Sequence, residues 1–329
     1  MTEDCDRAAQ LHVVLGAAGG TGAAVVRELV GQGRSVRAVT RRGHTAVGDG
    51  AQPPASYQDA AADVTNAAQL RRALAGAAVV YHCAQPAYTR WSEEFTAMNR
   101  GVIDAAAEAG AKLVFADNLY MYGPGSSPML ETTPQRAADR KGAQRIRLAA
   151  DLLARHRRGE LEVAIGRSSD YFGPHGTNSG AGERAFGALV AGKSAAATGR
   201  IDVEHSFSYL PDLARGMVVL GDRDEAAGRA WHLPVMDPIT VRAFLERAFA
   251  VAGMPVKIRV DGPLMLRAAG LFVPMAREVG VVMYQWTEPF ISDWSAFEAA
   301  FGPFERTSLD DALAVTIAWW RKWAAAAAA

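Results

Sequence analysis

A glycine-rich turn between an apolar strand and a helix constrains the fold of this chain more than any other feature. The run 11–16 is apolar, and glycines at 16, 19 and 22 then open a helical pattern. Glycine lets such a turn close tightly and lets backbone N–H groups approach a phosphate, which the dipole of the following helix also favours. The pattern predicts a pyrophosphate site, against the alternative of a tight turn without a ligand. Its residues are Gly16, Gly19, Gly20, Thr21 and Gly22.

Short apolar runs alternate with helical patterns over the first 175 residues. Strands are expected at 11–16, 35–40, 79–83, 112–116 and 161–166, with a weaker one at 57–62; helices are expected at 22–32, 67–74, 93–109 and 140–157. Most of the strand runs are continuously apolar, which is typical of a parallel sheet covered on both faces. The alternation therefore predicts an α/β fold with a doubly wound parallel sheet.

The pattern changes after Pro174 and becomes mainly helical. A glycine-rich loop leads to a helix that ends near Gly192, and one strand is expected at 203–209. Further helices are expected at 212–220, 240–252, 263–271, 274–286, 294–301 and 309–323. We therefore predict a binding domain over 11–175 and a smaller, mainly helical substrate lobe over 176–323, parts of which return to the first domain. The alanine run 324–329 is not interpreted.

Charge and cysteine content exclude several classes of protein. The 329 residues carry 35 Lys and Arg against 35 Asp and Glu, so their formal net charge is zero. This balance predicts neither a nucleic-acid partner nor a membrane partner. The two cysteines cannot build a disulfide framework, and no Cys/His spacing indicates a metal site. A polar N-terminus and the lack of an 18-residue apolar run predict a cytoplasmic protein.

The end of the second predicted strand bears on the choice of dinucleotide. An acidic residue there would bind a free ribose 2′-hydroxyl, whereas arginine accommodates a 2′-phosphate. The chain has Thr40, Arg41 and Arg42 at this place and no acid. This favours NADP(H) over NAD(H), with two solvated loop arginines as the alternative.

Two further strand ends carry polar candidates. Asp63 is suited to accept a hydrogen bond from adenine or to cap the following helix. His82 ends the fourth strand, where a structural role is favoured over a catalytic one.

These pieces together resemble an extended short-chain dehydrogenase/reductase of the NAD(P)-dependent epimerase/dehydratase family. The similarity rests on the glycine turn and on segments in family order: Asp63-Val64, 81–84, 99–103, 117–124, 166–174 and 206–214. It implies a Rossmann domain with a C-terminal substrate lobe, and a homodimer through the helices after strands four and five. In this family Asp63 and Val64 would bracket adenine, and Ala84 would lie near the ribose and phosphates of the cofactor.

The family's usual catalytic pair, Tyr-x-x-x-Lys, is absent from the chain. The five lysines are Lys112, Lys141, Lys193, Lys257 and Lys322, and none has a tyrosine four residues before it. In the family the lysine lowers the pKa of the tyrosine, which moves the proton. Lys141 or a nearby arginine is the candidate electrostatic replacement for that lysine, although arginine cannot act as a base.

Other residues must then handle the proton. Asn118 occupies the family's serine position and can polarise a carbonyl. Tyr120, two residues later, matches a substrate-facing acid/base of the dehydratase branch and is the first candidate proton donor, with aromatic packing as the alternative. Tyr88, Phe207 and Tyr209 are candidate substrate contacts, again with packing as the alternative.

We therefore predict an NADP(H)-dependent oxidoreductase that reduces a carbonyl or enone of a small apolar or aromatic metabolite. The first alternative is a non-redox dehydratase, isomerase or cyclase on the same fold. The second is a non-catalytic protein that senses NADP.

Overall fold

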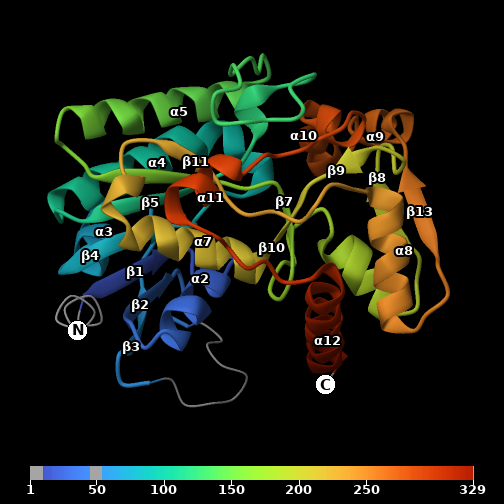
Figure 1. Cartoon of the computed structure of the whole chain (residues 1–329), viewed down its shortest axis with the longest axis horizontal. Helices are drawn as coiled ribbons and strands as arrows, with labels where there is room; N and C mark the ends of the chain where they lie inside the picture. The colour runs from blue at the N-terminus through green and yellow to red at the C-terminus, as the bar shows by residue number, and fades with distance from the viewer. Residues whose placement is uncertain (1–9, 45–53, 329) are drawn as a thin grey trace. The chain divides into compact units, whose positions relative to one another are not determined.

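A computed structural model describes residues 10–44 and 54–328 of the chain (Figure 1). Cys5 and most of the polar N-terminus considered above lie outside these residues. The contacts between Cα atoms divide the chain into two compact units that interleave along the sequence. The described part of the first unit is 10–44, 54–118, 144–167 and 213–233, and that of the second is 119–143, 168–212 and 234–328. The predicted domain limits, 11–175 and 176–323, stay predictions.

The first unit contains a seven-stranded sheet in which all neighbours are parallel. The strands are β1 (Leu11–Leu15), β2 (Ser35–Thr40), β3 (Tyr57–Ala61), β4 (Ala77–His82), β5 (Lys112–Asp117), β6 (Val163–Arg167) and β11 (Ala230–His232). Their order is β11-β6-β5-β4-β1-β2-β3. The strand order reverses between β1 and β4, because the chain runs outward from β1 through β2 to β3 and then returns to the other side of β1. Doubly wound folds bind their ligands at the carboxyl ends of the strands on either side of such a point. This confirms the predicted doubly wound Rossmann-type sheet.

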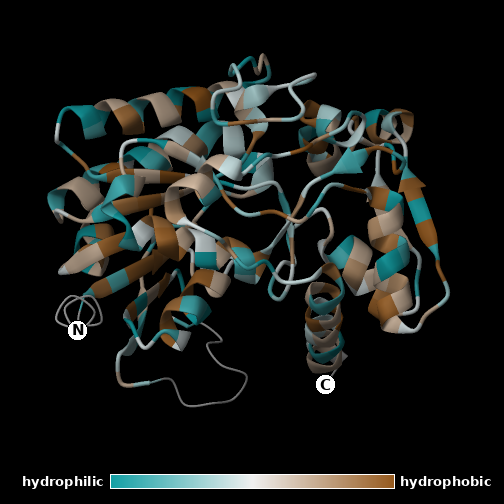
Figure 2. Cartoon of the chain, in the orientation of Figure 1, coloured by the Kyte–Doolittle hydropathy of each residue, from teal (hydrophilic) through white to brown (hydrophobic). Residues whose placement is uncertain are grey.

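Helices cover both faces of this sheet. They are α2 (Gly20–Gly31), α3 (Ala67–Leu74), α4 (Trp91–Glu108), α5 (Arg140–Arg157) and α7 (Leu210–Asp222). Apolar residues of α3, α4 and α5 form one buried core with residues of β1, β4, β5 and β6. On the opposite face α7 packs so closely on β4 that a Cβ at Gly221 would lie 2.2 Å from the Tyr81 hydroxyl. Figure 2 shows the sheet as mostly hydrophobic, as a doubly covered sheet requires.

The second unit is mainly helical around an aromatic core. Its helices are α6 (Ala188–Val190), α8 (Val241–Ala252), α9 (Pro263–Ala269), α10 (Pro274–Val281), α11 (Ser295–Phe301) and α12 (Leu309–Ala328). A π-helical turn, Gly182–Gly187, precedes α6. In the core, the rings of Phe207 and Phe244 stack with centroids 4.1 Å apart, and Phe172 and Phe186 pack beside them.

Three short strand pairs complete the second unit. The strands are β7 (Asp170–Phe172) with β10 (Phe207–Tyr209), β9 (Glu204–His205) with β12 (Ile239–Thr240), and β8 (Ala195–Thr198) with β13 (Ile258–Asp261). The prediction of a single strand at 203–209 is therefore wrong. The segment forms two short strands, β9 and β10, which are separated at Ser206 and pair with different partners. The helix predicted at 274–286 is also too long, because α10 ends at Val281 and a 3₁₀ turn, Met283–Trp286, follows.

Candidate functional site

The glycine-rich turn packs directly against the end of β4. Gly16 has φ +78°, and a Cβ there would lie 2.7 Å from the Ala84 Cα. A Cβ at Gly22 would lie 2.3 Å from the Gly16 carbonyl oxygen. Backbone atoms cannot move out of the way as a side chain can, so both positions require glycine. The turn therefore brings the start of α2 close to Ala84.

The N-terminus of α2 has the character of an anion site. Gly19 is its N-cap, no side chain caps it, and its first turn holds no acidic residue. The first N–H groups of a helix lack partners within the helix, and the helix dipole adds positive potential there. Gly20, Thr21 and Gly22 supply the first residues of this helix. The cradle fits the pyrophosphate of a dinucleotide, because it combines close backbone approach with unpaired donors.

The end of β2 is basic at its surface. Thr40 is buried, and its hydroxyl accepts a hydrogen bond from the His44 N–H at 3.2 Å. Arg41 and Arg42 follow and are both exposed. Within 10–44 and 54–328 neither arginine forms an ion pair.

Asp63 caps a turn rather than a helix. Its carboxylate accepts hydrogen bonds from the Thr65 N–H at 2.9 Å and from the Thr65 hydroxyl at 2.7 Å, and these bonds lower the pKa of Asp63. The N-cap of α3 is instead Asn66, whose side chain accepts from the Gln69 N–H. The N-cap alternative for Asp63 is therefore wrong. Val64 is half-buried and packs against the core.

His82 is part of the core of the first unit. Its Nε2 lies 3.0 Å from the Asn99 Oδ1, and the Asn99 amide donates to the Phe95 carbonyl. Burial lowers the pKa of His82 to about 4, although the hydrogen bond with Asn99 opposes that shift. The imidazole is neutral near pH 7, and its hydrogen bond holds it in place. This arrangement agrees with the structural role favoured above.

A buried ion cluster lies at the end of β5. The Asp117 carboxylate accepts from Arg145 at 2.7 Å and lies 3.4 Å from the Arg167 Nε. The Arg145 guanidinium also lies over the rings of Trp91 and Phe95, 4.7 and 4.8 Å from their centroids. Arg145 is thus a fixed positive charge already held by protein groups. Sequence reasoning did not single out this cluster, although Arg145 stands one helical turn after Lys141.

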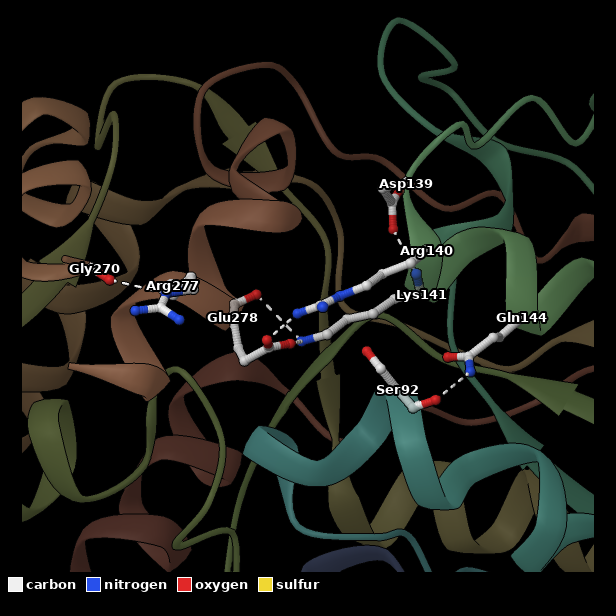
Figure 3. Close-up of polar contacts among 8 residues, drawn as sticks. All are labelled: Ser92, Asp139, Arg140, Lys141, Gln144, Gly270, Arg277 and Glu278. Carbon is white, nitrogen blue, oxygen red and sulfur yellow. Dashed lines mark hydrogen bonds and ion pairs between the residues drawn. The ribbon is translucent and has the colours of Figure 1, made fainter. Parts of the chain in front are cut away.

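Three buried polar atoms near the starts of α4 and α5 lack partners within the described chain. They are the Trp91 Nε1, the Ser92 Oγ and the Gln144 Oε1. The other polar atom of the Gln144 amide, Nε2, donates to the Ser92 carbonyl at 3.1 Å (Figure 3). Buried polar atoms are rarely left unsatisfied, so an orphaned group of this kind is a candidate ligand contact. The sequence carries no signal for it.

In the second unit Lys141 is fully buried and paired. Its Nζ lies 3.1 Å from the Glu278 carboxylate and donates to the Glu278 carbonyl at 3.2 Å; Arg140 also pairs with this carboxylate (Figure 3). Burial lowers the pKa of Lys141 to about 8, against the opposing effect of Glu278. Lys141 is therefore held by α10, a partner 137 residues away that no local pattern reveals.

Tyr120 belongs to a group of half-buried tyrosines in the second unit. It lies in the 3₁₀ turn Tyr120–Tyr122, and its carbonyl accepts from the Tyr284 hydroxyl at 3.2 Å. Burial raises the pKa of Tyr171 to about 12, and the neighbouring Tyr120 adds to this effect. Burial and the charge of Asp139 likewise raise the pKa of Tyr284. Asn118 is half-buried and directly follows β5 in the first unit.

The three predicted substrate contacts differ in their surroundings. Phe207 and Tyr209 are 2% and 4% exposed and belong to the aromatic core of the second unit. This burial favours the packing alternative for both. Tyr88 is half-buried in the 3₁₀ turn Tyr88–Arg90, with its ring edge toward Trp91 at a centroid distance of 6.1 Å.

Neither a metal cluster nor a membrane-spanning helix is found among the described residues. No group of three or more His, Cys, Asp and Glu side chains within them could hold a metal ion. None of the helices described is long and apolar enough to cross a membrane.

Comparisons with known proteins identify the family of the chain. The sequence profile of the NAD dependent epimerase/dehydratase family matches residues 12–233, so the chain belongs to this family. No curated protein sequence matches it significantly. This membership confirms the resemblance drawn from the motifs.

Solved structures are similar to the chain over nearly its whole length. An epimerase from Methanothermobacter thermautotrophicus has a TM-score of 0.80 at 14% identity, covering 100% of this chain and 97% of that one. A UDP-N-acetylglucosamine 4-epimerase from Methanobrevibacter ruminantium, in complex with UDP-N-acetylmuramic acid, has a TM-score of 0.77 at 16% identity, covering 96% of this chain and 99% of that one. The dTDP-glucose 4,6-dehydratase DesIV from Streptomyces venezuelae, with NAD and TYD bound, has a TM-score of 0.76 at 19% identity, covering 95% of this chain and 97% of that one. At these identities the likeness establishes the fold alone.

Proposed function

We propose that this protein is an NADP(H)-dependent oxidoreductase that reduces a carbonyl or enone of a small apolar or aromatic metabolite. The observation that carries the proposal is the anion cradle of α2 together with a basic β2 end. Gly16 and Gly22 bring backbone donors within reach of a pyrophosphate. Arg41 and Arg42 are exposed where an NAD-specific site would have an acid. We place this enzyme in the cytoplasm.

The residues of the first unit divide the work of holding the dinucleotide. Gly19, Gly20, Thr21 and Gly22 hold the pyrophosphate, and Arg41 and Arg42 pair with the 2′-phosphate. Asp63 and Val64 flank adenine, and Ala84 borders the ribose. When bound, the nicotinamide supplies or accepts a hydride. The unpartnered polar atoms of Trp91, Ser92 and Gln144 are assigned to a polar part of a ligand.

Asn118 and Tyr120 are assigned the substrate chemistry. The Asn118 amide donates a hydrogen bond to the substrate carbonyl oxygen and so polarises it. The Tyr120 hydroxyl gives a proton to the same oxygen. Tyrosine is neutral near pH 7, and the raised pKa values of Tyr171 and Tyr284 keep both neighbours neutral at higher pH as well, so they add no negative charge beside Tyr120. Tyr88, which is half-buried, is the remaining candidate for contact with substrate.

Cofactor choice is tested by titrating the purified protein with NADPH and NADH and following nicotinamide fluorescence. We expect NADPH to bind more tightly than NADH. The double variant Arg41→Ala/Arg42→Ala should lose about tenfold or more in affinity for NADPH but little in affinity for NADH. Arg72→Ala, which removes an exposed arginine of α3, is the matched control. Equal affinity for both dinucleotides in the wild type would exclude the assigned 2′-phosphate contact.

Catalysis is tested with a panel of small ketones and enones as NADPH oxidation is followed. We expect Asn118→Ala and Tyr120→Phe each to lower kcat by about 10² or more. Tyr57→Phe, on the exposed edge strand β3, controls for loss of a tyrosine hydroxyl. Full activity in both variants would remove these residues from the mechanism.

The relatives that act as epimerases and dehydratases favour a second candidate, a non-redox enzyme with a tightly held cofactor. Such an enzyme would turn substrate over without net consumption of NADPH. The third candidate, a non-catalytic NADP sensor, would capture a partner in a redox-dependent way and turn over no substrate. Product formed in proportion to NADPH oxidised excludes both.

A homodimer remains part of the proposal. The alanine-rich end of α4 suits close helix approach, but Ala105 and Ala106 are buried in the core of the first unit. The rest of the α4 surface is therefore what a partner copy would contact. Sedimentation velocity of the full chain distinguishes dimer from monomer.

A further inference from the structure

The exposed apolar side chains of this protein gather in one stretch of the second unit. Among the described residues, every large apolar side chain classed as exposed lies between 256 and 275, apart from Leu130, Val315 and Trp323. The stretch comprises β13 and then α9 and α10, which pack as neighbours (Figure 1). We call α9, α10 and the turn between them, residues 263–281, the apolar hairpin.

The apolar hairpin turns its hydrophobic side chains toward solvent. Phe272, Leu264 and Leu271 are 87%, 81% and 71% exposed, and Met265, Val273 and Met275 are about half exposed. Within α9 and α10 the buried residues are Leu266 and the acidic Glu278. This is the reverse of a surface helix that covers its own core. An outward apolar cluster of this kind marks an interaction surface.

The exposed charged residues of the stretch 254–281 are all positive. Lys257, Arg259, Arg267 and Arg277 are exposed between 254 and 281. The two acids of the stretch are buried and paired: Asp261 with Arg184 and Arg259, and Glu278 with Lys141 and Arg140. Although the total charge of the chain is zero, the stretch 254–281 therefore combines exposed apolar groups with exposed positive charge.

We propose that the apolar hairpin docks this protein on an anionic phospholipid surface. Leu264, Leu271 and Phe272 insert at the boundary between headgroups and acyl chains, where an amphipathic helix pair buries its apolar side. Arg267 and Arg277 flank the inserted tip and pair with lipid phosphates and anionic headgroups. The ion pairs of Glu278 hold α10 to Arg140 and Lys141 at the start of α5 during docking.

Charge favours a bilayer over a second copy of the chain. In a two-fold contact the same patch meets itself, so the arginines of one hairpin would approach those of the other. An anionic membrane instead attracts each basic group and accepts the apolar tip. The sequence prediction of no membrane partner rested on total charge alone, and this proposal departs from it.

The test is sedimentation of the full-length protein with two kinds of vesicle, one of phosphatidylcholine alone and one that also contains phosphatidylserine. We expect binding to the phosphatidylserine vesicles and weaker binding as salt is added. Leu271→Ser/Phe272→Ser should abolish binding to the phosphatidylserine vesicles. Arg267→Gln/Arg277→Gln should weaken binding to the anionic vesicles about thirtyfold, since each cation near such a surface is worth about a fivefold factor.

Two variants outside the hairpin serve as controls. Val315→Ser removes an exposed apolar side chain of α12, and Arg72→Gln removes an exposed arginine of α3. Both should bind vesicles as the wild type does. Thermal unfolding of every variant checks that it is folded, because a surface substitution should leave the midpoint nearly unchanged.

Three outcomes would overturn the proposal. The first is absence of wild-type binding to phosphatidylserine vesicles at low salt. The second is binding that the Leu271→Ser/Phe272→Ser variant retains. The third is a concentration-dependent dimer, seen by sedimentation velocity, that this variant dissociates while vesicles fail to bind; the hairpin is then a contact between copies. None of these results depends on cofactor binding or turnover.

Discussion

Asp117 is the shared carboxylate of the buried ion cluster in the first unit. Its carboxylate pairs with both Arg145 and Arg167, which are 3% and 1% exposed. Removing the shared carboxylate would leave two cations in a dry environment, and breaking a buried pair costs more than the pair contributes.

We therefore expect Asp117→Ala to lower the free energy of unfolding by about 3–5 kcal/mol. The measurement is urea unfolding followed by circular dichroism. Glu160→Ala, which breaks the exposed Arg158–Glu160 pair, should leave the unfolding curve unchanged. Equal effects of the two substitutions would mean that the buried cluster is hydrated or that the cations are held elsewhere.

Lys141 makes a second prediction at the residue scale. Burial lowers its pKa from 10.5 to about 8, so above that pH the folded state has released a proton that the unfolded state still binds. Stability must then rise with pH between about 8 and 10.5 and carry a penalty below that window. In Lys141→Met this contribution of roughly 3 kcal/mol should vanish.

The measurement for Lys141 is the difference in unfolding free energy between wild type and variant at several pH values from 7 to 10. Buried tyrosines titrate in both proteins, so the difference isolates Lys141. Lys322→Met, an exposed lysine of α12, is the control. A pH-independent difference would show that Lys141 stays protonated across this range.

At the scale of elements, the strand-turn-helix of β1 and α2 was the most predictable part of the molecule. The apolar run, the glycine spacing and the helical pattern all lie within 22 residues, so local rules suffice to describe it. The predicted limits of β2 and α3 match those observed. The alternating pattern of β2 and the N-cap of α3 also involve only residues that are close in the sequence. The short pairs β8–β13 and β9–β12 were missed, since strands of two to four residues exist only through a distant partner.

The glycine turn supplies the prediction at this scale. We expect Gly16→Ala to abolish dinucleotide binding and to destabilise the protein by about 3 kcal/mol or more, because the new Cβ meets the Ala84 backbone at a positive φ. Gly31→Ala, at the end of the same helix with nothing within 4 Å of the new Cβ, should be neutral or slightly stabilising. Calorimetry and NADPH titration measure the two effects. Wild-type binding by Gly16→Ala would contradict the assigned cradle.

At the scale of the whole molecule, a cofactor bound to the folded chain must also stabilise it. A ligand that binds only the native state at about 100 times its Kd adds about 2.7 kcal/mol. We expect NADPH at such an excess to raise the unfolding midpoint, and NADH at the same concentration to raise it less. Differential scanning fluorimetry of the wild type measures both shifts. An identical shift with both dinucleotides would contradict the role assigned to Arg41 and Arg42.

Local sequence patterns predict the sheet class, the glycine-rich turn and the absence of a Tyr-x-x-x-Lys pair, because each depends on residues near one another in the chain. Which polar groups are already paired depends on contacts between distant segments of the chain. Glu278 lies 137 residues from Lys141, and Asp117 lies 28 and 50 residues from its two arginines. The exposure of the apolar hairpin likewise could not be predicted from the sequence. Hydrophobic residues in a helical pattern predict burial unless the packing around them is known.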